Sequence, residues 1–193
     1  MRQNILSDSL YTLSYITNLI SSNLSTIDSL NKSMILDRDT YSRVFNPTIN
    51  WNLILINSFL EEYETYFMSD IPIEKERILK VKRKSKPAIV RLDKWKDLRK
   101  FRNCVLTHPF RDQKNNYNSV LQNGALHEFD IPNKPNEFRI VSGMVIITCA
   151  NIRKELDTIL ANLPPMRDQI KRFDYDIQAS NREVKRIMDL VNT

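Results

Sequence analysis

Apolar residues near the start of the chain recur at alternating steps of four and three residues, the spacing of one face of a long helix. This stripe covers almost four heptads and predicts a single helix over residues 4–31. A similar stripe predicts a last helix over residues 166–191. The first stripe consists of Leu6, Leu10, Leu13, Thr17, Ile20, Leu24 and Ile27, and the second of Met166, Ile170, Phe173, Ile177, Ser180, Val184, Ile187 and Val191.

The remaining patterns also favour helices. The chain contains only two glycines, which argues against sheets joined by tight turns and against a glycine-rich phosphate loop. Pro164 and Pro165 follow a predicted helix over residues 138–163, so this helix and the last one should form an antiparallel hairpin. We therefore predict an all-α, up-and-down bundle of about five main helices.

Two further prolines are expected to end helices, because proline disfavours the helical conformation of the residue before it. Pro47 should follow a short helix over residues 37–45. Pro87 should separate a basic helix over residues 73–85 from one that begins at about Ala88. After that helix, residues 111–135 show no helical period and are predicted to form one long mid-chain loop.

Positive charge is concentrated in one part of the chain. The formal net charge is +6, but residues 1–50 carry four basic and four acidic side chains. Residues 74–102, in contrast, carry thirteen basic side chains and four acidic ones. Such a concentration suits a polyanionic partner, although a solvated helix face is the plainer explanation of a charge run.

Several classes of site and location are disfavoured. The N-terminal segment is interrupted by polar residues, so we expect neither a signal peptide nor a membrane span. Cys104 and Cys149 are lone cysteines, which fits a reducing compartment, and we expect a cytoplasmic protein with no membrane association. The two histidines and two cysteines show no spacing typical of a zinc site, so we predict no metal and no cofactor.

The segment Asp93–Asp112 contains the residues with the clearest chemical meaning. Its apolar residues Leu98, Phe101 and Val105 lie at i, i+3 and i+7, which predicts an amphipathic helix. Arg102, Asn103 and His108 fall within two helical turns, and Pro109 should end the helix at the histidine. The helix dipole favours a cation at that end, which keeps the imidazole able to exchange protons near neutrality. Because an arginine can hold phosphate oxygens in a bidentate fork and a histidine can move a proton, the pair suits a phosphodiester.

This segment resembles the signature of the HEPN superfamily, in which an arginine, usually followed by a polar residue, precedes a histidine by four to six intervening residues. Here five residues separate Arg102 from His108, and Asn103 is the polar follower. The resemblance is sharp over residues 98–112 and only architectural elsewhere. It implies a bundle of four to five helices and a single HEPN-like domain over residues 1–193.

The resemblance also implies a metal-independent endoribonuclease, a toxin or phage-defence effector that acts on RNA and could have a regulatory or antitoxin partner. His108 would take the proton from a ribose 2′-hydroxyl or give one to the leaving oxygen. Arg102 would hold the scissile phosphate, and Asn103 would hydrogen-bond the phosphate or fix the imidazole. The basic side chains that would track the RNA backbone are Lys94, Arg99 and Arg111.

A homodimer is expected for two reasons. In the HEPN superfamily the motifs of two chains usually meet in one cleft. In addition, one histidine cannot easily serve as both base and acid, and a second chain would supply the other.

Plainer roles exist for the same residues. His108 could cap a helix end, and Arg102 could form a surface ion pair. Phe129 could stack on bases as in single-strand binders, or it could pin the loop to the bundle. A group of glutamates could orient the arginine or simply form a polar helix face, namely Glu61, Glu62 and Glu64. The alternative functions are therefore a non-catalytic HEPN-like bundle that binds RNA, a nucleotide or another protein, and a purely structural bundle.

Overall fold

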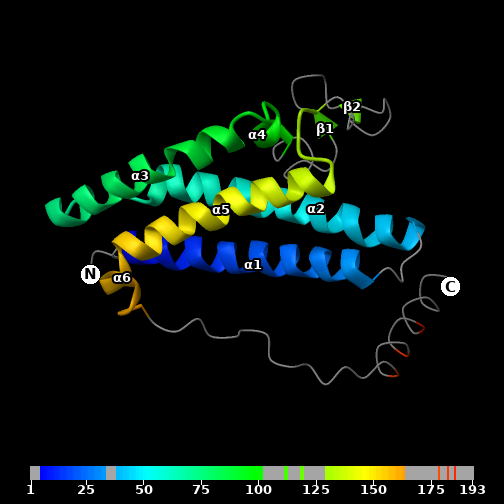
Figure 1. Ribbon diagram of the computed structural model, residues 1–193, viewed down its shortest axis with the longest axis horizontal. Coiled ribbons are helices and arrows are strands. Elements are labelled where there is room, and N and C mark those ends of the chain that lie inside the picture. Colours follow the sequence, from blue (N-terminus) through cyan, green and yellow to red (C-terminus); the bar gives the residue numbers. More distant parts are fainter. Residues whose placement is uncertain are drawn as a thin grey trace. The chain divides into compact units, whose positions relative to one another are not determined.

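The computed structural model describes residues 5–33, 38–101, 111–112, 118–119 and 129–163, together with residues 178, 182 and 185. The fold is all-α, as predicted (Figure 1). The long helices of the described part are α1 (Ile5–Ser33), α2 (Arg38–Glu61), α3 (Pro72–Leu92) and α5 (Pro135–Glu155). Successive long helices run in opposite directions, which gives the predicted up-and-down order (Figure 1).

Shorter elements connect or extend these helices. A π-helical turn, η1 (Glu62–Tyr66), continues α2, and single turns form α4 (Leu98–Phe101) and α6 (Asp157–Leu160). Within the predicted mid-chain loop, β1 (Arg111–Asp112) and β2 (Asn118–Ser119) pair antiparallel. All the named helices and strands belong to the first of the chain's two units, which are Met1–Leu163 and Pro164–Thr193.

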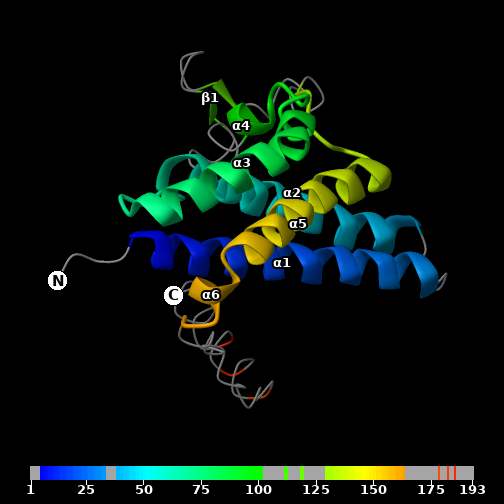
Figure 2. The ribbon, with the colours of Figure 1, turned by 60° about the vertical axis from the view of Figure 1, so that its left-hand side comes forward.

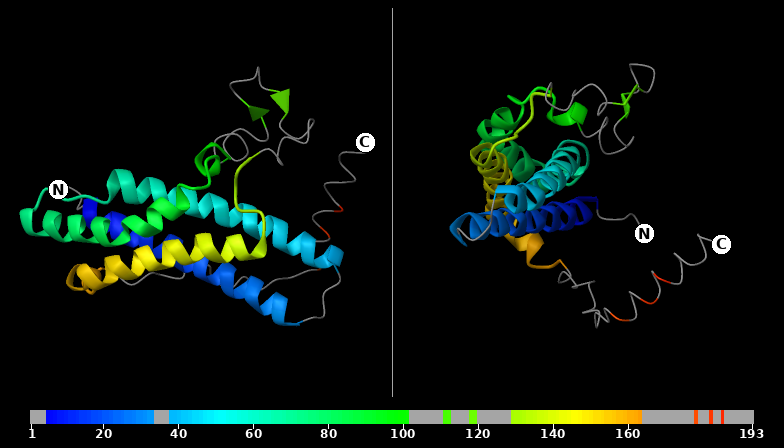
Figure 3. Two further views of the ribbon diagram at one scale, coloured as in Figure 1. Left: turned by 45° about the horizontal axis from the view of Figure 1, so that its top comes forward. Right: turned by 90° about the vertical axis from the view of Figure 1, so that its right-hand side faces the viewer.

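The core of the first unit lies between the four long helices. Helix α5 packs against α3, α1 and α2, and α1 also packs against α2 (Figures 2 and 3). The N-terminal stripe is buried, and α1 covers nearly the predicted residues 4–31, so this prediction is confirmed. The largest fully buried side chains include Phe59, Phe67, Phe101 and Phe138, which come from four different segments of the chain.

The predicted helix breaks at Pro47 and Pro87 are wrong, because α2 and α3 continue through these prolines. A proline inside a helix costs roughly 3 kcal/mol, since it removes one backbone hydrogen bond and its ring crowds the preceding turn. Both rings lie on the exposed side of their helices, while neighbouring residues such as Ile49 and Ala88 are buried. Packing of these neighbours therefore outweighs the local preference of proline.

The helix that was expected to begin at Ala88 and carry the arginine–histidine motif also differs from the prediction. Helix α3 ends at Leu92, a turn covers residues 93–97, and α4 begins at Leu98. Similarly, the predicted helix over residues 138–163 is interrupted at Leu156, whose side chain is fully buried. Both breaks follow tertiary packing rather than a proline or glycine.

Two other expectations concern parts of the chain that the structure describes only in part. The predicted last helix lies outside the described residues, except for the helical positions 178, 182 and 185. No helix within the described ranges is long and apolar enough to cross a membrane.

Candidate functional site

The predicted catalytic residues Arg102, Asn103 and His108 lie outside the described residues, so their roles stay predictions. The structure does describe the residues that flank the segment 102–110. Phe101 immediately precedes Arg102 and is buried in the core. Its ring makes an edge-to-face contact with Phe129, with the ring centroids 5.6 Å apart. Phe129 also packs against the core, so it does pin this part of the chain to the bundle.

Two aspartates join the chain before and after this segment. The backbone N–H of Asp130 donates to Asp97 Oδ2 at 2.9 Å, and the N–H of Lys96 donates to Asp130 Oδ2 at 3.2 Å. A direct backbone bond from Asp97 N–H to the Asp130 carbonyl, at 3.3 Å, completes the junction. Residues 96–97 and residue 130, which precede and follow the predicted catalytic segment in the sequence, are therefore held together.

A buried asparagine anchors α4 to α2. The side-chain amide of Asn57 donates to the Leu98 carbonyl at 3.0 Å and to the Leu53 carbonyl at 2.9 Å. Leu98 and Phe101 are both buried, as the amphipathic pattern of this segment predicts. The position of α4, which ends one residue before Arg102, is thus fixed by both hydrogen bonding and packing.

Arg99, predicted to bind RNA, is engaged by carboxylates in the structure. Its Nη1 and Nη2 donate to both oxygens of Glu64 at 2.8 and 2.6 Å, and Nη2 lies 3.5 Å from Asp93 Oδ1. The hydrogen bonds to Glu64 are the main cause of the raised pKa of Arg99. Glu64 therefore orients an arginine, and among the described residues that arginine is Arg99.

The other two predicted RNA-binding residues differ from Arg99. Lys94 is exposed in the turn after α3 and has no ion-pair or hydrogen-bond partner for its side chain within the described ranges. The backbone of Arg111 lies in β1, opposite Ser119, and its side chain is outside the described part. Neither observation tests a role in RNA binding.

Helix α3 carries most of the positive charge that the sequence indicated. It contains eight lysines and arginines and two glutamates, so its net charge of +6 equals the formal net charge of the entire chain. Its buried face, centred on Val81, packs toward the core and α5. With a turn of about 100° per residue, most of the basic residues fall along the two edges of that face.

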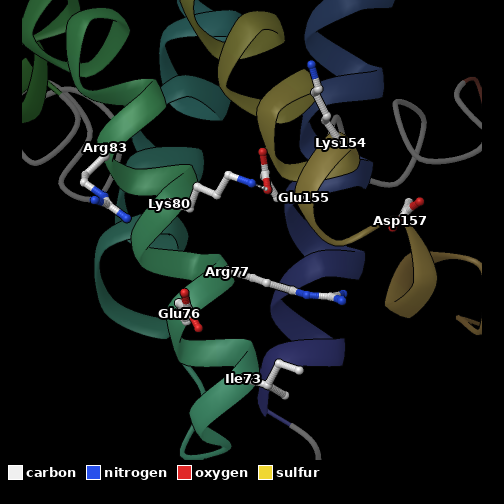
Figure 4. Close-up of a pocket in the computed structure, with 8 residues that line it drawn as sticks. All are labelled: Ile73, Glu76, Arg77, Lys80, Arg83, Lys154, Glu155 and Asp157. Carbon is white, nitrogen blue, oxygen red and sulfur yellow. Dashed lines mark ion pairs between the residues drawn. The ribbon is translucent and has the colours of Figure 1, made fainter.

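We call one of these the tied edge, because its cations contact the rest of the bundle; it consists of Arg77, Lys80, Lys84 and Arg91. Lys80 Nζ lies 2.8 Å from Glu155 Oε2, and Lys84 Nζ pairs with Glu155 Oε1 (Figure 4). Arg77 Nη1 donates to Thr158 Oγ1 at 3.1 Å. The Arg91 guanidinium lies 4.1 Å from the centroid of the Trp95 ring. These contacts join α3 to α5, α6 and the turn before α4.

Glu155 is the centre of the tied edge. Its side chain is only 8% exposed and accepts from two lysines, and these hydrogen bonds lower its pKa to about 2. A cleft of about 390 Å³ opens beside it, between α3, α5 and α6. In Figure 4, Arg77 and Lys80 extend toward α6 and Glu155, and Arg83 lines the same cleft from the next turn of α3. We interpret this cleft as an ion-pair clamp between helices.

We call the other edge of α3 the open edge, which is the stripe Lys75, Leu79, Lys82, Lys86 and Val90. These residues follow one another at steps of four, three, four and four, so they share one side of the helix. Within the described ranges no carboxylate pairs with any of its three lysines. Leu79 and Val90 are exposed apolar residues between these cations. Among the described residues, the open edge therefore presents lysines that no carboxylate pairs with, with Lys82 lying over the Tyr63 ring, next to exposed apolar side chains.

A groove of about 230 Å³ lies between the open edge and η1, lined by Tyr63, Glu64, Lys82, Lys86, Ile89 and Val90. Lys82 Nζ lies 5.8 Å from the centroid of the Tyr63 ring. That ring stacks on Phe59 and Phe67 and is held in place by them. Because Glu64 both lines the groove and binds Arg99, the groove adjoins α4.

Tyr63 belongs to the π-helical turn, a feature that is frequent at functional sites. Burial raises the pKa of its hydroxyl. This hydroxyl lies near Ser85, but no described residue forms a well-aligned hydrogen bond with it. The described contact of Tyr63 with a residue of the open edge is thus made by its ring, which faces Lys82.

Sequence reasoning missed the open edge and the groove for a definite reason. The expected break at Pro87 placed Lys82 and Val90 in different helices and left Lys86 between them, which concealed the stripe. A helix continued through Pro87 would have revealed it from spacing alone. In contrast, no local pattern in the sequence indicates the π-helical turn.

Comparisons and metal-site geometry add no further assignment. In the described part of the chain, no three or more histidine, cysteine, aspartate or glutamate side chains are grouped so that they could hold a metal ion. No protein-family model matches the chain, and no curated protein or solved structure matches it.

Proposed function

We propose that the protein is a metal-independent endoribonuclease of the HEPN type that acts in the cytoplasm as a toxin or phage-defence effector. The observation that carries the proposal is the arginine–histidine motif at Arg102 and His108, which begins one residue after α4. It is supported by the lysines of the open edge, which pair with no carboxylate among the described residues and suit a polyanion, and by the Glu64–Arg99 contact that joins the neighbouring groove to α4.

The proposed chemistry divides between the motif and the basic surface. His108 takes the proton from a ribose 2′-hydroxyl or gives one to the leaving oxygen. Arg102 holds the scissile phosphate and stabilises its developing charge, while Asn103 bonds the phosphate or orients the imidazole. The RNA backbone is tracked by Lys94, Arg99 and Arg111, to which the structure leads us to add Lys75, Lys82 and Lys86.

The engagement of Arg99 affects its proposed role. To bind RNA, its guanidinium has to exchange Glu64 for a phosphate oxygen, whereas Lys94 has no such bond to any residue that the structure describes. Arg99 is therefore expected to contribute less to RNA affinity than Lys94.

The proposal includes a homodimer in which two motifs face each other, because one histidine would act as base and the other as acid. It also allows a regulatory or antitoxin partner that covers the basic surface. Sedimentation or light scattering of the full chain tests the dimer, since a monomer at the concentrations that give cleavage would contradict it.

Cleavage of end-labelled RNA in the presence of EDTA tests the proposed activity. We expect wild type to cleave, and His108→Ala and Arg102→Ala each to lose about 10²-fold or more in rate with unchanged thermal unfolding, because a general acid or base contributes 10²–10⁴-fold. Products with a 2′,3′-cyclic phosphate would agree with attack by the 2′-hydroxyl. RNA binding by wild type without any turnover would instead assign the chain to the non-catalytic alternative.

A further inference from the structure

We propose that the groove between η1 and α3 is a nucleobase subsite, which holds one unpaired base of the RNA while Lys82 and Lys86 bind the adjacent phosphates. The inference rests on the proposed function for its choice of ligand. It adds a feature that the arginine–histidine motif does not provide, which is a contact to a base rather than to the backbone.

The shape and lining of the groove fit a single base. Its volume of about 230 Å³ is smaller than the 300–1,000 Å³ that is typical of sites for drug-sized ligands. The Tyr63 ring, Ile89 and Val90 supply apolar walls. Tyr63 is only 4% exposed and stacks on Phe67 with a centroid separation of 5.5 Å, so this wall is rigid.

The charges around the groove favour an anionic ligand. Glu64 is the acidic residue among those that line it, and its carboxylate is already bound by both Nη atoms of Arg99. Lys82 and Lys86 have no carboxylate partner within the described ranges. The groove therefore combines apolar walls with uncompensated cations, which is the combination that binds single-stranded nucleic acid.

The location of the groove connects it to the predicted chemistry. Glu64 holds Arg99, which is three residues before Arg102 in the sequence. A base bound in the groove would thus lie near α4, the element that precedes the motif in the sequence. Because bases in a duplex are stacked and paired, a groove of this kind selects unpaired nucleotides.

Binding of an oligonucleotide that cannot be cleaved tests the subsite separately from the nuclease activity. The probe is a fluorescent single strand with 2′-O-methyl ribose, which lacks the free 2′-hydroxyl. The matched probe is an abasic oligomer of the same length and charge. We expect wild type to bind the base-bearing probe about tenfold more tightly than the abasic one, as one stacked or buried base contributes in other single-strand binders.

Val90→Asn should remove most of this tenfold preference, because it places a polar side chain on the wall of the groove. Ile147→Asn on α5 is the matched control, since Ile147 and Val90 are both 49% exposed on long helices. The double variant Lys82→Gln/Lys86→Gln should weaken the binding of both probes equally. It should also make the slope of log K against log salt concentration shallower by about 1.4, because each phosphate contact on a single strand contributes roughly 0.7 to that slope.

The proposal is overturned if wild type binds the two probes equally, or if Val90→Asn keeps the full preference while it folds as wild type does. It is also overturned if an acidic peptide binds wild type but not Val90→Asn, while the oligonucleotide binds both proteins equally well, because the groove then serves a protein partner. Loss of RNA cleavage in all assays with an intact base preference would overturn the nuclease function and leave the subsite standing.

Discussion

The two edges of α3 both carry lysines but differ in what those lysines contact. On the tied edge, Lys80 and Lys84 share Glu155, and Arg77 reaches Thr158. On the open edge, Lys75, Lys82 and Lys86 have no carboxylate partner in the described part of the chain. The difference teaches that charge density alone does not locate a binding surface. The cations that have no carboxylate partner among the described residues are the ones that we expect to bind a partner.

The position and the partners of the neighbouring carboxylates determine which edge of α3 forms ion pairs within the fold. Glu155 lies at the end of α5, beside the tied edge. Glu64 lies at the corresponding place beside the open edge, but it binds Arg99 of α4 instead of a lysine of α3. One glutamate therefore stabilises the contact between helices, whereas the other leaves the lysines free and fixes the element that leads to Arg102.

The largest effect is expected from removing the free charges. The triple variant Lys75→Gln/Lys82→Gln/Lys86→Gln should lower the affinity for single-stranded RNA at 50 mM salt by about two orders of magnitude, because three phosphate contacts are lost. Fluorescence anisotropy with the 2′-O-methyl probe measures this. The matched variant Arg77→Gln/Lys80→Gln/Lys84→Gln, which removes equal charge from the tied edge, should lose much less affinity and more thermal stability. Equal losses of affinity would remove the distinction between the edges.

A second effect concerns the element that joins the open edge to the motif. Asn57→Ala leaves the Leu98 carbonyl without its buried donor, which should cost about 1–3 kcal/mol in the free energy of unfolding. Urea unfolding measures the change, and the exposed Asn50→Ala in the same helix corrects for helix propensity. If both variants unfold alike, α4 is not anchored by this hydrogen bond.

A third, smaller effect tests the Glu64–Arg99 contact. Both side chains are partly exposed, and a double-mutant cycle with Glu64→Gln and Arg99→Gln should give a coupling of about 0.5–1 kcal/mol in unfolding. The coupling should fall as salt is raised. In addition, Lys94→Gln should weaken RNA binding more than Arg99→Gln does, since only Arg99 has to exchange a carboxylate for the phosphate. The reverse order would contradict that reasoning.

The last effect is expected at the tied edge, where the stabilisation that Glu155 provides is present at neutral pH and is lost in acid. The pKa of Glu155 is about 2 in the folded protein and lower than its ordinary value of 4.5. A carboxylate with a lowered folded pKa stabilises the fold above its unfolded pKa, and this stabilisation is lost as the pH falls toward 2. Glu155→Gln should therefore make thermal stability less dependent on pH between about 5 and 2. The matched control for the substitution itself is Glu76→Gln, which changes an exposed residue of the same cleft.

The general architecture was predictable because it depends on local periodicity. Leu6, Leu10 and Leu13 define the buried face of α1, and the spacing of apolar residues likewise identified Leu98 and Phe101 as core. The prolines misled the prediction, because the packing of Ile49 and Ala88 is a tertiary effect that no local rule includes.

The candidate site was less predictable for a different physical reason. The basic character of residues 74–102 is evident in the sequence, but the partners that separate the two edges are distant along the chain. Glu155 is 71 residues from Lys84, and Arg99 is 35 residues from Glu64. Spacing within one helix shows which lysines share an edge, and only the packed structure shows which of them already have a carboxylate.

The steady-state kinetics of RNA cleavage in EDTA test the central claim most directly, with wild type, the open-edge triple variant and His108→Ala compared at increasing RNA concentration. The account predicts that the open-edge variant has a KM raised by about 10²-fold with kcat largely kept, because it loses phosphate contacts that are not part of the chemistry. It predicts that His108→Ala loses kcat by at least about 10²-fold. A wild-type KM in the open-edge variant, or a wild-type kcat in His108→Ala, would contradict it.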